Sequence, residues 1–426
     1  MICKSPLMPS NEAFTAIPRT VRVLIVGGSY GGLSSALALL DLCGGRLARF
    51  NFNADSQPPE SQIPVEITVV DERDGFYHLI GSPKALACDQ FASKTWIRFQ
   101  DIPALQSPNV RFLRGTVNAV NCEEKSAQIL DLDTKEPREE RYDFLIASSG
   151  LRRVFPTVPQ SLLRHQFLEE AKRHKEDIQK AHDGVTIIGG GAVGVEMAAE
   201  LKVLDPKQKV TLIHSRERLL SAEPLPDDFK ERVASVLRET GVEVVLGRRV
   251  IETTAVETEG EKRTWQLTLS NGMQLKTGHV MNAVSKCIPT SSYLPKETLT
   301  QDGYVDIQPT LQFPERAPNS ESHFAIGDIA LWAGIKRCGG AMHMGHYAAT
   351  NIHQIMLSQR TGVKPEFMTL QQTPPVIGLA LGHTAVTYTP AEGTRHGEEL
   401  MASMFGEDMG HTICWNYMKL SEPCQC

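Results

Sequence analysis

Long hydrophobic runs are missing from this 426-residue sequence. No window of about 18 consecutive apolar residues occurs, so no segment is predicted to span a bilayer. Residues 1–20 lack a basic segment followed by an apolar one, and position 2 is not glycine. They therefore predict neither a secretory signal nor a myristoylation site but a loose leader, and the expected location is cytoplasmic.

A surplus of basic charge is also missing. Lysine and arginine number 44 against 50 aspartates and glutamates, which gives a formal net charge of −6. A protein with this balance has no extended cationic field, so nucleic acid is not an expected partner. Any polyanion that binds must be held by a local site.

Cysteine and hydrolase motifs are absent too. The nine cysteines have neither the spacing of a metal site nor that of a small disulfide-rich fold, so we expect reduced thiols and no metal. The sequence contains no HExxH motif and no Ser-His-Asp order. These absences still allow an enzyme in which a bound cofactor carries the chemistry.

The length and composition that are present belong to a multidomain globular protein. Hydrophobic residues make up 41% of the chain and charged residues 22%, which excludes long disorder and fibrous repeats. A chain of 426 residues exceeds the usual size of one domain. We therefore expect two or three domains.

A strand, a glycine cluster and a helix follow one another near the start of the chain, in the segment VRVLIVGGSYGGLSSALALL. Gly27, Ser29 and Gly32 occupy the three positions of a dinucleotide fingerprint, with serine in place of the middle glycine. Such a turn directs backbone N–H groups and the positive end of a helix at a pyrophosphate. The segment predicts the first half of a Rossmann unit.

The second half of that unit is the strand VEITVVDERDGF, which carries Asp71 at its end. A carboxylate there accepts hydrogen bonds from the adenosine ribose. The separation of Gly32 from Asp71 exceeds the usual spacing. The intervening stretch RFNFNADSQPPESQIP is polar and rich in proline and serine, so we interpret it as an inserted surface loop.

The pattern repeats in GVTIIGGGAVGVEMAAELKVL, where Gly189, Gly191 and Gly194 keep the GxGxxG register. The next strand, KVTLIHSRERLL, ends without an acid, and Ser215 and Arg216 stand there instead. An arginine at this place pairs with a 2′-phosphate, whereas a carboxylate repels it. The pattern favours NADPH, with NADH still open.

Two such units predict an α/β fold with two Rossmann-like dinucleotide-binding domains and a small C-terminal α+β region. The economical division of the two nucleotides is one tightly held FAD and one exchangeable nicotinamide nucleotide. We expect a leader at residues 1–20, an FAD domain at 21–155 and 284–370, an NAD(P)H domain at 156–283 and a C-terminal domain at 371–426.

Three later segments resemble elements of a known family and occur in the same order: RYDFLIASSG, MNAVSKCIP and ESHFAIGDIA. Together with GGAMHMGHYAATNIHQIML and the tail segments VIGLALGHTAVTYTP and FGEDMGHTICWNYMKL, they resemble the apoptosis-inducing-factor-like, ferroptosis-suppressor type of flavoprotein. That family is related to type II NADH dehydrogenases and has the glutathione-reductase-like architecture. The resemblance runs from about Val21 nearly to the end.

The resemblance implies an FAD-dependent NAD(P)H oxidoreductase that passes electrons to a quinone-like small-molecule acceptor. The residues that it implies for FAD are Gly27, Gly28, Ser29, Tyr30, Gly31, Gly32, Asp71, Lys84, Val117, Gly150 and Asp328. Those expected to contact NAD(P)H are Gly189, Gly191, Gly194, Glu196, Ser215 and Arg216. Two alternatives stay open, since Lys84 also fits a solvated surface lysine and Val117 an ordinary strand residue.

Few residues are expected to take part in the chemistry directly, because hydride transfer mainly needs two stacked rings and no water. His343 and His346 are candidates for contact with the flavin or the acceptor. Cys88 stands alone where disulfide reductases have two cysteines, so a dithiol relay by that route is excluded. Arg153 and its neighbours replace a lysine of animal members, and arginine does not titrate.

The sequence leaves several alternatives open. The tail residues Cys424 and Cys426 are expected to be inert, although a redox pair, a prenylation signal or an adventitious metal ligand stays open. Peripheral membrane association and the oligomeric state are undecided. Other functions to be tested are a tailoring oxidoreductase of a biosynthetic pathway and a signalling protein of the cell-death type with little turnover.

Overall fold

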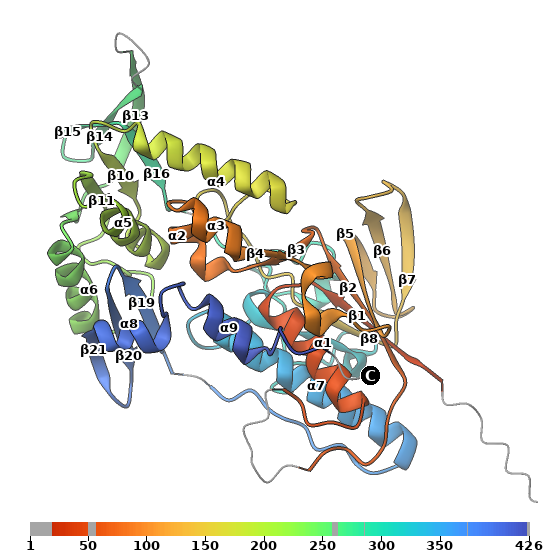
Figure 1. The fold of residues 1–426 in the computed structure, drawn as a ribbon. Coiled ribbons are helices and arrows are strands. Elements are labelled where there is room, and N and C mark those ends of the chain that lie inside the picture. Colours follow the sequence, from red (N-terminus) through yellow and green to blue (C-terminus); the bar gives the residue numbers. More distant parts are fainter. Residues whose placement is uncertain (1–18, 50–56, 258–262, 285, 373, 424–426) are drawn as a thin grey trace, which may run out of the picture.

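A computed structural model describes residues 19–49, 57–257, 263–284, 286–372 and 374–423 of the chain (Figure 1). Most of the predicted leader and the tail residues Cys424 and Cys426 lie outside these ranges. Part of the predicted inserted loop, residues 50–56, lies outside them as well.

The first sheet has seven strands in the order β18-β8-β1-β2-β5-β6-β7. They are β1 (Val21–Val26), β2 (Val65–Asp71), β5 (Val110–Asn121), β6 (Ser126–Asp131), β7 (Pro137–Arg141), β8 (Phe144–Ala147) and β18 (His323–Ala325). Strands β18, β8, β1, β2 and the first half of β5 run parallel. The central strands β1 and β8 are near-continuous apolar runs, which is typical of parallel sheets covered on both faces. The chain therefore returns to its first sheet late in the sequence.

The second sheet is parallel, with the order β12-β11-β10-β16. Its strands are β10 (Val185–Ile188), β11 (Val210–Ile213), β12 (Glu243–Val245) and β16 (His279–Asn282). An antiparallel sheet lies beside it, formed by β13 (Val250–Glu257), β14 (Arg263–Leu269) and β15 (Gln274–Thr277). The helices of this half of the molecule are α4 (Arg164–Gln179), α5 (Ala192–Leu204) and α6 (Asp227–Glu239).

The C-terminal part of the chain is a small α+β unit. It contains an antiparallel sheet of β19 (Ile377–Leu381), β20 (Thr384–Thr389) and β21 (Gly393–Gly397), followed by α8 (Glu398–Met404) and α9 (His411–Tyr417). The sheet shares a core with α5 and α6, whereas Cys414 and Met418 belong to the core of the first sheet. This unit thus contacts both halves of the molecule, and the predicted fold class is confirmed.

Short elements connect these layers. They are β3 (Gly75–Tyr77), α2 (Ser82–Ala85), α3 (Asp89–Thr95), β4 (Trp96–Arg98), β9 (Leu151–Arg152) and β17 (Ile288–Pro289), with 3-10 turns at Leu79–Gly81, Phe99–Asp101, Pro103–Leu105, Lys296–Thr298, Ser320–Ser322 and Gly327–Ile329. Strands β9 and β17 pair with each other at the two crossings between the halves.

Two long helices carry the core of the first half. Every residue of α1 (Tyr30–Cys43) is buried, because this helix lies between the sheet and α7 (Cys338–Thr361). A Cβ on Gly345 would lie 2.5 Å from the Gly31 carbonyl oxygen, so the two helices approach at small residues.

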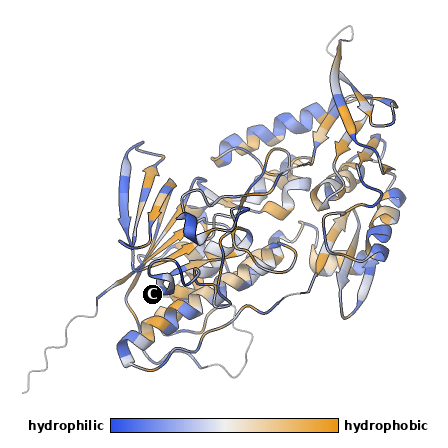
Figure 2. Ribbon diagram, turned by 180° about the vertical axis from the view of Figure 1, so that it is seen from behind, coloured by the Kyte–Doolittle hydropathy of each residue, from blue (hydrophilic) through white to orange (hydrophobic). Residues whose placement is uncertain are grey.

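In Figure 2 helix α4, by contrast, is coloured largely hydrophilic. Within the described residues, no helix has both the length and the apolar character needed to cross a bilayer.

Candidate functional site: two glycine turns and the elements around them

The first glycine turn, residues 27–32, joins β1 to α1. Gly27 has φ +106°, and a Cβ there would lie 2.6 Å from the Ser148 carbonyl oxygen. A Cβ on Gly32 would lie 1.8 Å from the Gly27 carbonyl oxygen. Only glycine fits both places, so the sequence closes this turn tightly. Ser29 makes no side-chain cap and α1 has no acid in its first turn, which leaves the helix amides available to an anion.

Asp71 stands at the end of β2, beside this turn. Its Oδ2 accepts a hydrogen bond from the Gly28 N–H at 2.6 Å, and its Oδ1 accepts one from the Arg73 N–H at 2.8 Å. Burial raises the pKa of Asp71, and the Arg73 side chain opposes that rise. The strand end and the glycine turn are thus brought together, and the role of Asp71 toward a ribose stays a prediction.

Asp328 and Gly150 follow neighbouring strands of the first sheet, β18 and β8. Asp328 lies in the 3-10 turn after β18, and its Oδ2 is 3.5 Å from Nη2 of Arg153. Both side chains are largely buried, with exposed fractions of 23% and 19%. Gly150 has φ +67° and open space where a Cβ would stand. The guanidinium therefore orients the carboxylate that the sequence singles out for FAD.

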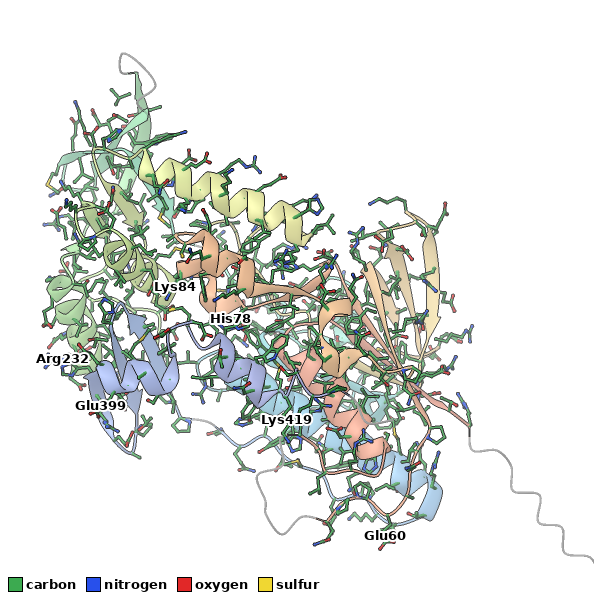
Figure 3. The ribbon with its side chains drawn as sticks, in the orientation of Figure 1. Glu60, His78, Lys84, Arg232, Glu399 and Lys419 are labelled. Atoms are coloured by element: carbon green, nitrogen blue, oxygen red, sulfur yellow. The ribbon has the colours of Figure 1, made fainter. Side chains whose placement is uncertain are left out.

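Val117 and Lys84 are more peripheral. Val117 lies in β5 and pairs with Ile129 of β6. It follows shortly after the residue of β5 that pairs with Asp71 of β2. Lys84 lies in α2, and its Nζ donates a hydrogen bond to the Glu407 carbonyl oxygen at 2.6 Å. Figure 3 labels Lys84 and His78 on the part of the chain that faces α9. The FAD contacts of Lys84 and Val117 stay predictions.

The second glycine turn, residues 189–194, repeats the geometry of the first. Gly189 has φ +117°, and a Cβ on Gly194 would lie 2.0 Å from the Gly189 carbonyl oxygen. A Cβ on Gly191 would meet nothing within 4 Å. Gly191 therefore faces open space at the start of α5, where the fold needs no glycine but a pyrophosphate would need the room.

His214 takes the place that Asp71 has in the first half. The Gly28 N–H donates to Asp71, and in the same position the Gly190 N–H donates to Nδ1 of His214 at 3.1 Å. Burial lowers the pKa of His214, so the imidazole accepts this bond as a neutral ring. Arg216 follows on the exposed side, and no carboxylate of the described residues forms an ion pair with it. The second site thus has no acid where the first has one.

Glu196 lies on α5, one turn beyond the second glycine turn. Its carboxylate is buried, and Oε1 accepts a hydrogen bond from the Ala380 N–H of β19 at 3.1 Å. Burial raises the pKa of Glu196 to about 8 and that of its neighbour Glu200 to about 7. The side chain therefore connects the second half to the C-terminal sheet, and its predicted contact with NAD(P)H is untested.

Replacing Glu196 with glutamine is expected to stabilise the fold increasingly as the pH rises. The pKa of Glu196 in the folded protein, about 8, exceeds its ordinary value of 4.5. The stability that protonated Glu196 contributes to the wild-type fold is therefore complete below pH 4.5 and is lost as the pH rises through 8. Glutamine keeps the acceptor for Ala380 without a titrating proton. The variant should gain a few kcal/mol over wild type between these limits.

Thermal unfolding of both proteins between pH 5 and pH 9 measures this gain. Glu66→Gln, at an exposed position of β2, is the matched control and should show a constant difference from wild type. A difference in melting temperature between Glu196→Gln and wild type that stays constant from pH 5 to pH 9 would contradict the prediction.

Helix α7 brings the two candidate histidines to the same region. Ala341, in its first turn, lies against Gly31 and Gly327, so the helix starts beside the first glycine turn and the Asp328 turn. His343 is exposed, and its ring centroid is 6.0 Å from that of Tyr417 in α9. Burial lowers the pKa of His346 to about 4, so this ring is neutral at pH 7.

Among the described residues, no cluster of three or more His, Cys, Asp or Glu side chains is arranged to bind a metal ion.

One arrangement near this helix was not predicted. The thiol of Cys414 in α9 lowers the pKa of Cys338, the first residue of α7, and Cys338 raises the pKa of Cys414. Neither residue has a cysteine nearby in the sequence, so spacing gave no signal of the contact. Only the path of the C-terminal unit across the first half brings the two thiols together.

Comparison with known proteins agrees with this geometry. The chain is 49% identical over 424 residues to oxidoreductase OXR1 of Ajellomyces capsulatus, covering 97% of this chain and 92% of that protein. It is 27% identical over 348 residues to ferroptosis suppressor protein 1 of Xenopus laevis, covering 81% and 83%. The resemblance expected from the motifs is thereby confirmed.

Solved structures share the fold at low identity. NDH2 from Plasmodium falciparum in complex with NADH matches with a TM-score of 0.65 at 12% identity, covering 95% of this chain and 97% of that one. The water-forming NADH oxidase from Lactobacillus brevis bound to NADH matches with a TM-score of 0.60 at 20% identity, covering 86% and 75%. The family model for pyridine nucleotide-disulphide oxidoreductases matches residues 11–349. The chain therefore belongs to the pyridine nucleotide-disulphide oxidoreductase family.

Proposed function

We propose that this protein oxidises NADPH, or NADH, by way of FAD and passes the electrons to a quinone-like small molecule. Family membership supports FAD and a nicotinamide nucleotide as the cofactors. The observation that carries the proposal is the pair of glycine turns, each closed by glycines that no larger residue could replace and each followed by a helix without an acid in its first turn.

The residues of the first half fit FAD. The amides at the start of α1 would hold the pyrophosphate, and the Asp71 carboxylate at the end of β2 would accept hydrogen bonds from the adenosine ribose. Asp328, oriented by Arg153, would accept hydrogen bonds from the ribityl hydroxyls. FAD supplies the ability to take up a hydride and to release an electron pair. The protein's part is to hold both nucleotides in line and to exclude water.

The residues of the second half favour NADPH. His214 replaces the acid found in the first half, and Arg216 has no carboxylate partner among the described residues. An engineered NADPH oxidase with the same fold, at 19% identity and a TM-score of 0.59, carries substitutions that remove an aspartate and add a serine and two arginines. Serine and arginine also follow His214 here. We infer that Ser215 and Arg216 bind the 2′-phosphate.

Replacing Arg216 with alanine should raise the KM for NADPH about 10- to 100-fold, the effect of losing a charged hydrogen bond worth about 1.5–3 kcal/mol. The KM for NADH should change little, because NADH has no 2′-phosphate. Steady-state rates with both nucleotides measure the effect. Arg232→Ala, at an exposed position of α6 (Figure 3), is the control. Equal losses with NADPH and NADH would refute the assignment.

We infer that the acceptor binds between α7 and α9, because aromatic and imidazole side chains of both helices lie there. The ring of His411 stacks on Trp415 with centroids 5.8 Å apart, and His343 lies beside Tyr417. Such a surface fits a flat conjugated molecule better than a charged one. Location in the cytoplasm and peripheral contact with a membrane stay predictions.

Anaerobic mixing of the FAD-loaded protein with NADPH or NADH tests the proposal, followed by a panel of quinones. Rapid loss of flavin absorbance and its recovery on adding simple quinones are expected. Flavin reduction with no turnover of any quinone would favour a tailoring enzyme for one biosynthetic intermediate. Slow flavin reduction by both nucleotides, with a long-lived complex, would favour a signalling protein. A folded protein that takes up no FAD would refute all three.

A further inference from the structure

The loop between β12 and β13, residues 246–249, lies against the strand end that carries His214 and Arg216. The Gly247 N–H donates a hydrogen bond to the Arg216 carbonyl oxygen at 2.9 Å, and the Arg248 N–H donates one to the His214 carbonyl oxygen at 3.0 Å. These bonds continue the pairing of β11 with β12 beyond the ends of both strands. The sheet therefore brings together the backbones of Arg216 and Arg248, which are far apart in the sequence.

Gly247 fixes the turn of this loop. Its φ is +65°, a conformation that favours glycine, and the Glu217 carboxylate occupies the place where a Cβ would stand. Nη1 of Arg248 donates a hydrogen bond to the Gly247 carbonyl oxygen at 2.8 Å, so the guanidinium folds back over its own loop. A guanidinium has several N–H donors, and the bond to Gly247 uses only part of them. The others are available to a ligand.

The charge of Arg248 is not balanced by a neighbouring acid. The residue is partly buried, and no carboxylate of the described residues forms an ion pair with it or with Arg216. Arg218, on the same loop as Arg216, differs, because Asp227 and Glu231 pair with it at 3.3 and 3.6 Å. Withdrawing a charge from water without a counter-charge is unfavourable. Two unpaired cations at one strand end therefore indicate an anionic ligand.

The same strand end contacts the second glycine turn. The Gly190 N–H donates to Nδ1 of His214 at 3.1 Å, and the Gly190 carbonyl oxygen accepts a hydrogen bond from the Leu220 N–H at 2.8 Å. In a Rossmann unit the strand end beside the glycine turn meets the adenosine ribose, whose 2′ position carries the additional phosphate of NADPH. A nucleotide held by the amides at the start of α5 would direct that phosphate toward Arg216 and Arg248.

We propose that Arg248 is a second cation for the 2′-phosphate of NADPH and binds this group together with Arg216. The inference rests on the proposed function, which assigns the second glycine turn to the nicotinamide nucleotide and Arg216 to the phosphate. Both guanidinium groups present planar pairs of N–H donors that match phosphate oxygens. Their positive charges also outweigh the carboxylate of Glu217, which lies against Gly247. Selectivity for NADPH then depends on the β12–β13 loop as well as on the loop after β11.

Binding of NADP⁺ and NAD⁺ to the FAD-loaded protein tests the proposal without turnover. The two ligands differ only by the 2′-phosphate, and neither donates a hydride. Isothermal titration calorimetry should show that Arg248→Ala binds NADP⁺ about 10- to 100-fold more weakly than wild type, the effect of losing a charged hydrogen bond. The affinity for NAD⁺ should not change. Arg248→Lys keeps the charge without the planar fork and should lose less.

Arg249→Ala is the matched control, because it removes the same charge one residue further along the chain. Arg249 is exposed, and its N–H donates a hydrogen bond to Oγ of Ser270 at 3.2 Å, so its backbone belongs to the pairing with β14. This variant should bind both NADP⁺ and NAD⁺ like wild type. A loss of NADP⁺ affinity in Arg249→Ala as large as in Arg248→Ala would reduce the effect to overall charge and overturn the proposal.

Other outcomes separate this proposal from the proposed function. Wild-type affinity of Arg248→Ala for NADP⁺ would overturn the role of Arg248. Equal losses with NADP⁺ and NAD⁺ would overturn it too, since the side chain would then only shape its loop. If wild type binds NAD⁺ as tightly as NADP⁺ while NADH reduces the flavin, the phosphate site fails and the oxidoreductase function stands. If Arg248→Ala loses NADP⁺ selectively but neither nucleotide reduces the wild-type flavin, the proposed function fails and the phosphate site stands.

Discussion

Replacing Gly191 with valine is expected to slow flavin reduction by subsaturating NADPH and NADH about 100-fold or more while FAD stays bound. Gly191 has no neighbour within 4 Å of an added Cβ, and its backbone is in an extended conformation that valine adopts readily. The branched side chain would instead fill the space at the start of α5 that a pyrophosphate needs. Losing two charged hydrogen bonds of about 1.5 kcal/mol each weakens binding about 100-fold or more.

Stopped-flow mixing of each nucleotide with the yellow protein measures this effect through the flavin absorbance. Gly191→Ala is the matched control, since a single methyl group meets nothing and should cost far less. Gly194→Val is a useful contrast, because its Cβ would collide with the Gly189 carbonyl oxygen and damage the fold itself. Normal flavin reduction by folded Gly191→Val would remove the second glycine turn from the nucleotide site.

Replacing Asp328 with alanine is expected to release FAD. Its carboxylate is largely buried after β18, beside the first glycine turn, and it forms an ion pair with Arg153. A charged hydrogen bond to the ribityl chain would contribute about 1.5–3 kcal/mol, so the Kd for FAD should rise about 10- to 100-fold. Asn at this position keeps an acceptor and should lose less.

Retention of yellow colour through gel filtration, followed by titration of the stripped protein with FAD, measures the change. Asp302→Ala, in an exposed turn, is the control and should retain FAD like wild type. Removing the carboxylate also leaves the Arg153 guanidinium without that partner, so circular dichroism should show that the protein is still folded. A folded Asp328→Ala protein with wild-type affinity for FAD would refute the assignment.

Most of the fold was predictable because its strongest constraints are local. Gly27 and Gly32, and likewise Gly189 and Gly194, meet within single turns, so a short stretch of sequence shows that no larger side chain fits. Asp71 is far from the first turn in the sequence, but the strand that ends at Asp71 was still correctly predicted to complete the first unit. The strand register places β2 beside β1 regardless of the loop between them. Both nucleotide-binding units follow from these residues.

Other features needed contacts between distant segments. The predicted contact of Glu196 with the nucleotide stays a prediction, and the bond of its carboxylate to the Ala380 amide of β19 appears only in the structure. The sequence shows only that the second unit has no acid at its strand end, and the bond between His214 and the Gly190 N–H appears once the sheet is assembled. No periodicity or spacing encodes such pairs, because each partner is set by how separate layers pack.

By itself, the sequence determined that this chain has two dinucleotide turns, in which order they come, and that the second has no acid at its strand end. The physical reason is that a tight turn is a property of a few consecutive residues. Only the tertiary structure decided that Asp328 faces Arg153 and that Cys414 of α9 lowers the pKa of Cys338 in α7. Those pairs exist because β18 and α9 return to the first half from far along the chain.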